Sequence, residues 1–200
     1  METTSASHAA NGCRTPDHHR RGVPLTDLRY PIGPFAYHGS MTDTGRADCV
    51  RRIAAAPGRL RASVSGLDEE QLDTAYRPGG WTIRQVVHHV PDSHLNAYTR
   101  MRLALTEDTP TIKPYDEKRW AELPDARTLP VSISLALLDA LHARWVPLLQ
   151  QLDGTSGARQ FRHPEHGRLM SLDELIALYA WHGDHHVAHV TTLRERMGWR

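Results

Sequence analysis

Four stretches of the chain place apolar residues three or four positions apart, which is the spacing of one face of an α-helix. We predict helices at about residues 44–64, 83–105, 134–152 and 172–197. Each is long enough to bury a continuous apolar stripe against its neighbours. No stretch of useful length alternates with the two-residue period of a β-strand. The pattern therefore predicts an all-α protein, a four-helix bundle with long connections of unequal length.

Local signals mark where these helices begin and where they should bend. Residues 82–85 and 171–174 have the sequence of capping boxes in front of the second and the last helix. Residues 68–71 look like a further capping box that opens a short turn. A proline inside a helix removes a backbone hydrogen bond, so Pro57 should kink or split the first helix and Pro91 should disturb the second.

The remaining segments have compositions of their own. Residues 1–27 are rich in Ser, Thr, His, Gly, Arg and Pro without an apolar period, which predicts a disordered N-terminal extension before a single domain at residues 28–200. Residues 30–35 contain two prolines and are predicted to be extended. Residues 107–130 form a long connection with four prolines, and its aromatic residues indicate a packed loop that covers something.

The overall composition argues against several classes of protein. A chain of 200 residues with 40% hydrophobic and 24% charged residues is typical of one globular domain. The formal net charge of +1, without a basic stripe, argues against a nucleic-acid partner. No apolar run approaches the roughly 20 residues that span a bilayer, and the N-terminus lacks a signal pattern, so we expect a cytoplasmic protein with no membrane partner. The two cysteines argue against a disulfide framework or a cysteine zinc site, whereas the 14 histidines are an excess.

Four of these histidines fall within eight positions of the last predicted helix. On a helical wheel His186 lies at the centre of the apolar stripe, and His182 lies close beside it. His189 lies on the shoulder of the stripe and His185 further out. A buried imidazole needs a polar partner, and histidines at positions i and i+4 can bind one metal ion together. The alternatives are rings bonded to carbonyl groups or a histidine-rich surface tract, but two rings on the apolar face favour the metal.

Two segments that contain histidines resemble a known family in combination. One is residues 80–94, which begins GWTIRQVVHH, and the other is residues 181–190. Together they are similar to the DinB superfamily, and more narrowly to its YfiT branch, whose members are described as metal-dependent hydrolases and as bacillithiol S-transferases. Pro91 departs from that family, which usually has alanine there. The resemblance covers about residues 28–199, with shorter similarities at 30–33, 106–110 and 114–118.

The resemblance implies one divalent metal ion per chain, held by a histidine of the second helix and two of the last. The family pattern places these ligands at His89, His182 and His186. The apolar stripes select the same three, because His89 lies on the flank of its stripe whereas His88 points away. Three neutral imidazoles suit zinc, although the ligand type also admits nickel, iron or manganese. A bundle of the DinB type and a homodimer are implied by the resemblance as well.

The chemistry of such a centre depends on whether a base stands beside it. Gly183 occupies the position at which a zincin carries its catalytic glutamate, so no carboxylate is evident next to the ligands. We therefore expect the ion to activate a low-molecular-weight thiol for S-transfer to an electrophilic small molecule. The alternative is a metal-dependent hydrolase that uses metal-bound water, with Glu165 as a candidate catalytic residue that shuttles the proton.

Two further expectations concern the surroundings of the ion. The two longest connections offer Tyr115, Trp120 and His163 as candidates for contact with a small-molecule substrate. A non-catalytic protein is the third alternative, in which the metal only staples the bundle of a stress-response module. Such a site would have a closed shell, with His94, His189 or a carboxylate as the fourth ligand.

Overall fold

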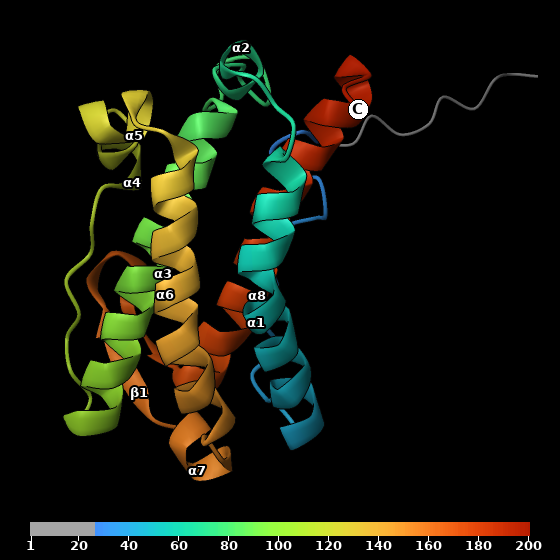
Figure 1. Ribbon diagram of the computed structural model, residues 1–200. Coiled ribbons are helices and arrows are strands. Elements are labelled where there is room, and N and C mark those ends of the chain that lie inside the picture. The colour runs from blue at the N-terminus through green and yellow to red at the C-terminus, as the bar shows by residue number, and fades with distance from the viewer. Residues whose placement is uncertain (1–26) are drawn as a thin grey trace, which may run out of the picture.

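The computed structural model describes residues 27–200, and its four long helices lie side by side (Figure 1). They are α1 (Asp43–Val64), α3 (Ile83–Thr106), α6 (Val131–Gln150) and α8 (Leu172–Met197). These helices confirm the predicted all-α four-helix bundle. The predicted disordered extension, residues 1–27, lies outside the described residues except for Asp27.

The long helices are arranged in an order that differs from their order along the chain. Each packs on two others, in the cyclic order α1, α8, α3, α6. α1 and α8 run in one direction and α3 and α6 in the other (Figure 1). The consecutive long helices α3 and α6 are therefore parallel neighbours. The chain between them has to return along the length of the bundle.

That return segment, residues 107–130, is partly helical. It contains the short helices α4 (Glu117–Trp120) and α5 (Pro124–Thr128), and α5 packs on α3. Two more short helices, α2 (Glu69–Leu72) and α7 (Gly154–Gly157), lie at opposite ends of the bundle (Figure 1). The connection is thus packed in part: Ile112, Ala121 and Ala126 are buried, whereas Trp120, one of the aromatic residues on which the prediction rested, is exposed.

The capping boxes are complete at two of the three predicted places. Those in front of α2 and α3 have both reciprocal hydrogen bonds. In front of α8 the Ser171 hydroxyl accepts from the backbone N–H of Glu174, but the Glu174 carboxylate binds Arg168. The third box is therefore only half formed, because a guanidinium is the stronger partner for that carboxylate.

Pro57 does not split the first long helix, and Pro91 does not end the second. α1 and α3 each continue through the proline. Both prolines are buried between neighbouring helices. Packing of a long helix on its neighbours therefore outweighs the loss of one backbone hydrogen bond.

A small β-hairpin is the other departure from the predicted pattern. β1 (Gln160–His163) and β2 (Arg168–Ser171) pair antiparallel, joined by the 3₁₀ turn η1 (Pro164–His166). Phe161 lies opposite Met170, and both are buried in the core. Each strand has only 4 residues, too short for its alternation to stand out in the sequence.

The segment before α1 folds over α8, and it begins with a turn instead of the predicted extended chain. The Gly33 N–H donates to the Tyr30 carbonyl at 2.9 Å. Pro31 fixes the second position of this turn, and Gly33 supplies a φ of +81°. The Gly33 carbonyl then accepts from the indole N–H of Trp181 at 3.1 Å. This segment therefore covers part of the face of α8 that carries the histidines.

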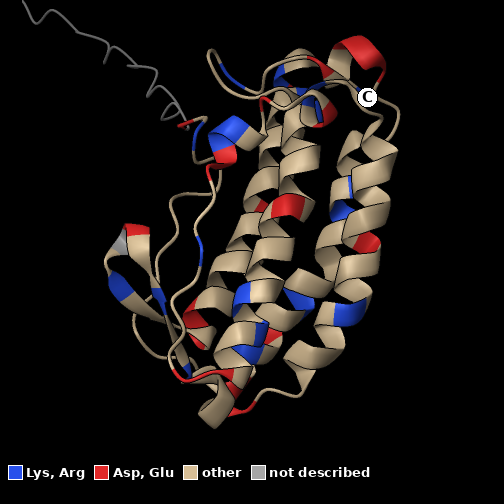
Figure 2. Cartoon of the chain, turned by 90° about the vertical axis from the view of Figure 1, so that its left-hand side faces the viewer, with Lys and Arg blue, Asp and Glu red and all other residues tan. Residues whose placement is uncertain are grey.

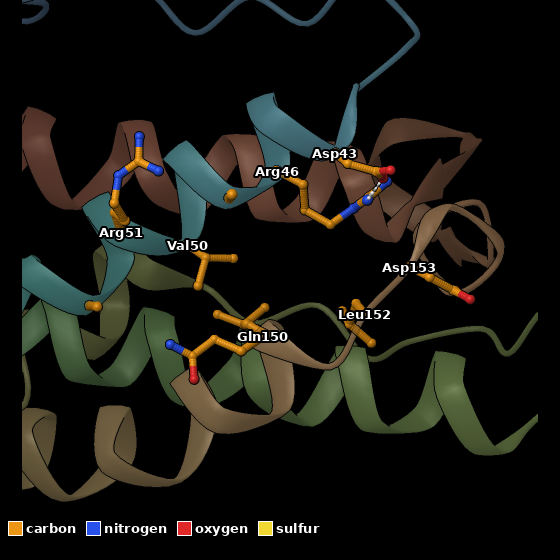
Figure 3. A pocket seen from close by; sticks show the side chains of 10 residues that line it. Asp43, Arg46, Val50, Arg51, Gln150, Leu152 and Asp153 are labelled. Atoms are coloured by element: carbon orange, nitrogen blue, oxygen red, sulfur yellow. Dashed lines mark hydrogen bonds and ion pairs between the residues drawn. The ribbon is translucent and has the colours of Figure 1, made fainter.

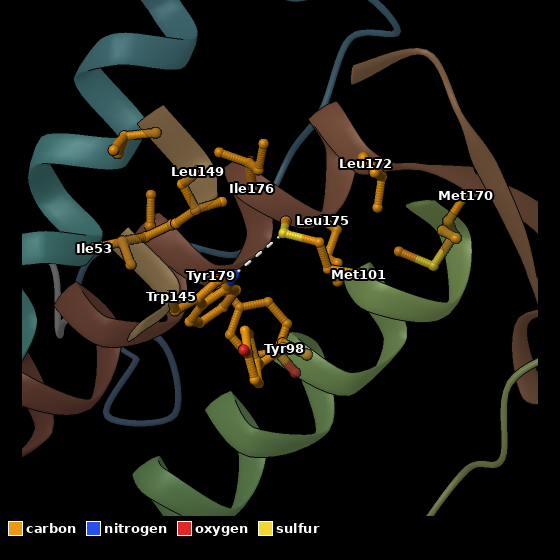
Figure 4. Packing of buried hydrophobic residues seen from close by; sticks show 14 of the residues in the cluster. Ile53, Tyr98, Met101, Trp145, Leu149, Met170, Leu172, Leu175, Ile176 and Tyr179 are labelled. Atoms are coloured by element: carbon orange, nitrogen blue, oxygen red, sulfur yellow. Dashed lines mark hydrogen bonds between the residues drawn. The ribbon is translucent and has the colours of Figure 1, made fainter. Parts of the chain in front are cut away.

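Two apolar clusters fill the bundle. One gathers around Trp145, Tyr98, Met101 and Tyr179 (Figure 4). The other lies nearer the opposite end and includes Leu60, Val86, Leu138 and Val190. On α8 the first cluster ends at Ala180 and the second begins at Val187. The interval between them holds His182, His185 and His186.

The charged side chains lie mostly outside this interior. Figure 2 shows basic and acidic residues interspersed over the helices. The buried arginines of the described chain each bind two carboxylates, as a buried charge requires. These pairs are Arg46 with Asp43 and Asp173, and Arg84 with Glu69 and Asp73.

Candidate metal centre

The three predicted ligands meet inside the bundle. His89 comes from α3, His182 and His186 lie one turn apart on α8, and one ring nitrogen of each lies within 4.8 Å of the others. The Nε2 atoms of His89 and His182 are 3.3 Å apart. Two nitrogens that bind one zinc ion at about 2.0–2.1 Å with tetrahedral angles are about 3.3 Å apart. The positions of these residues therefore fit a single ion.

Burial keeps these rings neutral, as a metal ligand must be. It lowers the pKa of His89 to about 4 and the pKa values of His182 and His186 well below the usual range. The neighbouring imidazoles act in the same direction, because two positive charges side by side repel. At neutral pH each ring therefore has one nitrogen with a free lone pair.

A chain of hydrogen bonds determines which nitrogen of His182 has that lone pair. It starts at the backbone carbonyl of Ile53, which can only accept, so His142 donates to it from Nδ1 over 2.9 Å. Nε2 of His142 then accepts from Nδ1 of His94 at 2.9 Å, and Nε2 of His94 accepts from Nδ1 of His182 at 3.2 Å. Each neutral ring has one donor and one acceptor. Nε2 of His182, the atom near His89, is therefore unprotonated.

A second chain of hydrogen bonds likewise determines which nitrogen of His186 is unprotonated. Nε2 of His189 lies 3.2 Å from the carbonyl oxygen of Arg29 and donates to it. Nδ1 of His189 then accepts from Nδ1 of His186 at 3.4 Å. Nε2 of His186 is left unprotonated. Contacts of this kind orient metal-binding histidines and fix their tautomers.

The first chain depends on the proline in α1. In a regular helix the Ile53 carbonyl would accept from the N–H of residue 57, but Pro57 has none. Ile53 is fully buried, so its carbonyl needs another donor, and His142 supplies it. Pro57 thus leaves the Ile53 carbonyl free to accept the first hydrogen bond of the series His142, His94 and His182.

Replacing His142 with phenylalanine should weaken metal binding although the ligands stay in place. The variant removes the acceptor for His94, so His182 is no longer held in one tautomer. Loss of such an outer contact typically costs roughly 10–100-fold in metal affinity. Competition with a chelating dye measures the affinity, and ¹⁵N NMR of the metal-free protein reports the tautomer of His182.

The matched control is His88→Phe. His88 is as buried as His142 and also makes two hydrogen bonds, but they lie outside both histidine chains. An equal loss of affinity in the two variants, with the His182 tautomer unchanged, would mean that His142 acts through packing alone.

The histidines that would close the coordination shell are engaged elsewhere. Both ring nitrogens of His94 and both of His189 take part in the two chains. Neither ring has a lone pair left for the ion. Among residues 27–200 the group able to hold an ion is therefore the three-histidine set, with coordination positions left for a small molecule.

The carboxylates of α8 stay away from this set. Gly183 packs closely on α1, since a Cβ there would lie 3.0 Å from that of Ala56. A glutamate at this position, as in a zincin, would collide with α1. Asp184 binds Arg52 and Arg59 of α1 instead of the histidines.

A cavity of about 520 Å³ opens beside the histidines. Its wall is formed by the segment before α1, the loop before α3, the start of α4, and α8. His186 lines it directly, and so do His185 and His189. The Trp81 ring lies 4.8 Å from that of His89, and Tyr76 stacks on His189 at 4.0 Å. Of the three predicted ligands, His186 therefore lines an aromatic cavity directly, and His89 packs against Trp81 in the wall of that cavity.

The residues predicted for substrate contact and proton transfer do not line this cavity. Tyr115 packs on Trp120 with ring centroids 4.7 Å apart, and burial raises the pKa of Tyr115. His163 is buried on β1, and Glu165 is exposed on the turn between the strands. Their roles stay predictions.

Other residues line the cavity. Lys118 and Tyr30 line the cavity from segments that resemble the family, and Tyr76 and Arg77 line it from the loop before α3. That loop shows no periodicity, and its Pro-Gly-Gly sequence at residues 78–80 indicates only a turn. His142 has no signal in the sequence, because histidine is intermediate in burial and a single histidine on a helix does not indicate its partner.

A second cavity, of about 500 Å³, lies between the start of α1 and the end of α6 (Figure 3). Arg46, the buried charge in its wall, is neutralised by Asp43 and Asp173. No histidine lines it. The chemistry is therefore concentrated in the cavity beside the three histidines.

Comparisons with known proteins agree with this assignment. Residues 52–190 match the family model of the DinB superfamily. A protein of Bacillus mycoides strain KBAB4, named "Putative metal-dependent hydrolase", is 54% identical over 175 residues, which cover 88% of this chain and 100% of that protein. A protein of the same description from Bacillus cereus strain B4264 is 53% identical over equal shares.

The similarity extends to a solved structure. YfiT from Bacillus subtilis superimposes with a TM-score of 0.85 and 46% sequence identity, over 86% of this chain and 99% of YfiT. YfiT is described as "a probable metal-dependent hydrolase with an unusual four-helix bundle topology". The family match, the relatives and the shared fold confirm the resemblance seen in residues 80–94 and 181–190, and the chain belongs to the DinB superfamily.

Proposed function

We propose that the protein is a metal-dependent enzyme in which His89, His182 and His186 hold one divalent ion. The observation that carries the proposal is the convergence of three neutral rings, two of them with their Nε2 lone pairs fixed, beside a cavity that His186 lines and that admits a small molecule. Zinc suits the ligand type and the spacing best. When bound, such an ion lowers the pKa of a coordinated water or thiol, so that it becomes a nucleophile at neutral pH.

We assign the reaction to S-transfer from a low-molecular-weight thiol to an electrophilic small molecule. A new carbon–sulfur bond forms, the bond from that carbon to its leaving group breaks, and the thiol proton passes to solvent. This reaction needs no carboxylate base. The charged wall of the cavity has a single carboxylate, that of the exposed Glu117. The chain's own residues bind and orient the two substrates and keep the ligand rings neutral.

Hydrolysis of an amide or ester is the second candidate. Two observations favour it: the names of the Bacillus relatives, and the position of Glu117 in the wall of the cavity. Glu117 would accept the proton of the attacking water, a role for which the sequence alone offered Glu165. Loss of such acid–base help costs roughly 10²–10⁴-fold in rate.

Thiol titration of the cobalt-substituted protein should distinguish the two reactions. If a thiol binds the ion through sulfur, a sulfur-to-cobalt charge-transfer band is expected, and turnover of an electrophile should need added thiol. The matched variants are Glu117→Gln and Glu165→Gln. S-transfer predicts that both remain active, because neither carboxylate is needed.

Other outcomes would contradict S-transfer. Turnover of esters or amides without thiol, no spectral response to thiols, and a large loss in Glu117→Gln would establish hydrolysis. Unfolding on removal of the metal, with neither activity present, would favour the stapled bundle. That alternative is disfavoured by the engagement of His94 and His189 in the hydrogen-bond chains.

The homodimer and the cytoplasmic location stay predictions. α6 is long and apolar enough to cross a membrane by length and composition alone. Its inner residues Leu135, Leu138 and Trp145 pack in the bundle core, whereas Ile133 and Leu137 on its outer face are exposed. Sedimentation at micromolar concentration would measure the oligomeric state.

A further inference from the structure

The charged residues around the cavity beside the histidines are mostly basic. Arg29, Arg77 and Lys118 line it, together with Glu117. Arg29 is neutralised by Asp27, which accepts from its Nε and Nη2 atoms. None of the ion pairs within residues 27–200 involves Arg77 or Lys118. With Asp27 and Glu117 counted against the three basic residues, the cavity has one positive charge in excess.

Arg77 presents a particular edge of its guanidinium group. Its Nη1 donates to the Pro78 carbonyl at 3.0 Å, which leaves the edge formed by Nε and Nη2. Nε is buried and has no hydrogen-bond partner among the described residues. In Arg46 the same edge binds both oxygens of Asp173, at 2.7 and 3.0 Å. A planar carboxylate is the group that this edge fits.

The loop before α3 holds Arg77 in place. A Cβ at Gly80 would lie 2.7 Å from Cγ of Arg77 and 3.1 Å from the Tyr76 ring, so only glycine allows the chain to close over both side chains. The Arg77 guanidinium lies 5.4 Å from the centre of the Tyr76 ring. Tyr76 in turn stacks on His189, which bonds the metal ligand His186. The arginine is thus positioned by contacts that continue to the metal centre.

An orphaned histidine nitrogen also belongs to this cavity. Nδ1 of His185 is buried without a hydrogen-bond partner among the described residues, although its ring is stacked on Trp181 at 4.2 Å. A buried polar atom without a partner costs free energy unless a ligand or water supplies one. The two residues that contain such atoms, His185 and Arg77, both line the same cavity.

We infer that this cavity binds a substrate that carries a carboxylate group, and that Arg77 binds this group while the reacting atom lies at the three histidines. The inference deepens the proposed function, since it names the substrate class of the same site. Lys118, exposed at the rim, adds long-range attraction for the anion. Arg77 acts here as a binding and specificity residue and takes no part in bond making.

Calorimetric titration with succinate, and with neutral succinamide of the same shape, tests the inference. The protein is used as purified, with its metal content measured. We expect wild-type protein to bind succinate at least roughly tenfold more tightly than succinamide, and Arg77→Gln to lose roughly tenfold or more of the succinate affinity. Arg77→Lys, which keeps the charge but not the two-pronged edge, should fall between them. Arg51→Gln is the matched control, because Arg51 lies in the other cavity.

The outcomes separate this inference from the proposed function. Equal binding of succinate and succinamide would overturn the inference. Unchanged binding of succinate to Arg77→Gln would also overturn it, because the dianion would then contact the metal or Lys118 and not Arg77. A thermal melt of each variant shows that the fold is retained, and if Arg77→Gln unfolds, Arg77→Lys decides. The titration needs no turnover, so an inactive protein that still binds succinate through Arg77 would contradict the proposed reaction and leave the carboxylate site standing.

Discussion

The double variant His182→Ala, His186→Ala is expected to lose its bound metal ion and all activity that depends on it. It removes both ligands of α8 and leaves His89 alone, and one imidazole does not hold a divalent ion in competition with water. Elemental analysis of protein purified without a histidine tag should fall from about one ion per chain to a trace. Circular dichroism should still show the helical bundle.

The matched control for this loss is His185→Ala. His185 lies on the same helix, is equally buried and lines the same cavity, but it is not one of the three converging rings. We expect this variant to retain its ion. Loss of metal in His185→Ala, or its retention in the double variant, would show that the ligand set is wrong.

Acidification from pH 7 to 4 is expected to unfold the metal-free protein. Histidine has a pKa of about 6.5 in an unfolded chain, whereas burial lowers the pKa of His89, His142 and His189 to about 4 in the folded protein. Below pH 6.5 the unfolded chain therefore binds more protons, and the stability present above that pH is lost as the pH falls toward 4. Each shift is worth about 3 kcal/mol, a large part of the roughly 5–15 kcal/mol by which domains are stable.

Urea unfolding at successive pH values measures this loss. His142→Phe should make the free energy of unfolding depend less steeply on pH, because one group fewer takes up a proton. Bound zinc should move the loss to lower pH, because protons and the metal compete for the same nitrogens. A free energy of unfolding that stays constant between pH 7 and 5 would contradict neutral, buried rings.

The helices of this fold could be predicted from the sequence, but their arrangement could not. The apolar period locates α1, α3, α6 and α8, because each helix buries one stripe. The apolar period does not indicate that α3 and α6 are parallel neighbours, because it identifies the buried face of a helix but not the helix that packs on this face. The effect of Pro57 could not be predicted for a similar reason. Pro57 leaves the Ile53 carbonyl without its helical donor, and this carbonyl acquires a new donor only because α6 brings His142 beside it.

The candidate site was predictable where residues share one helix and unpredictable where separate elements meet. His182 and His186 stand out because they are one turn apart on an apolar face. His89 was identified as a ligand from the family resemblance together with its position on the flank of the apolar stripe of α3. Tyr76 and Arg77 reach the cavity through a turn closed by Gly80, and a turn of this kind leaves no periodic pattern.

X-ray absorption spectroscopy of the zinc-loaded protein, without added thiol, tests the central claim most directly. It counts the imidazoles around the ion and measures their distance. The structure predicts three imidazole nitrogens at about 2.0–2.1 Å and at least one oxygen from solvent in the remaining position. A shell of four imidazoles would mean that His94 or His189 leaves its hydrogen-bond chain to close the site, and it would contradict an ion that is open to substrate.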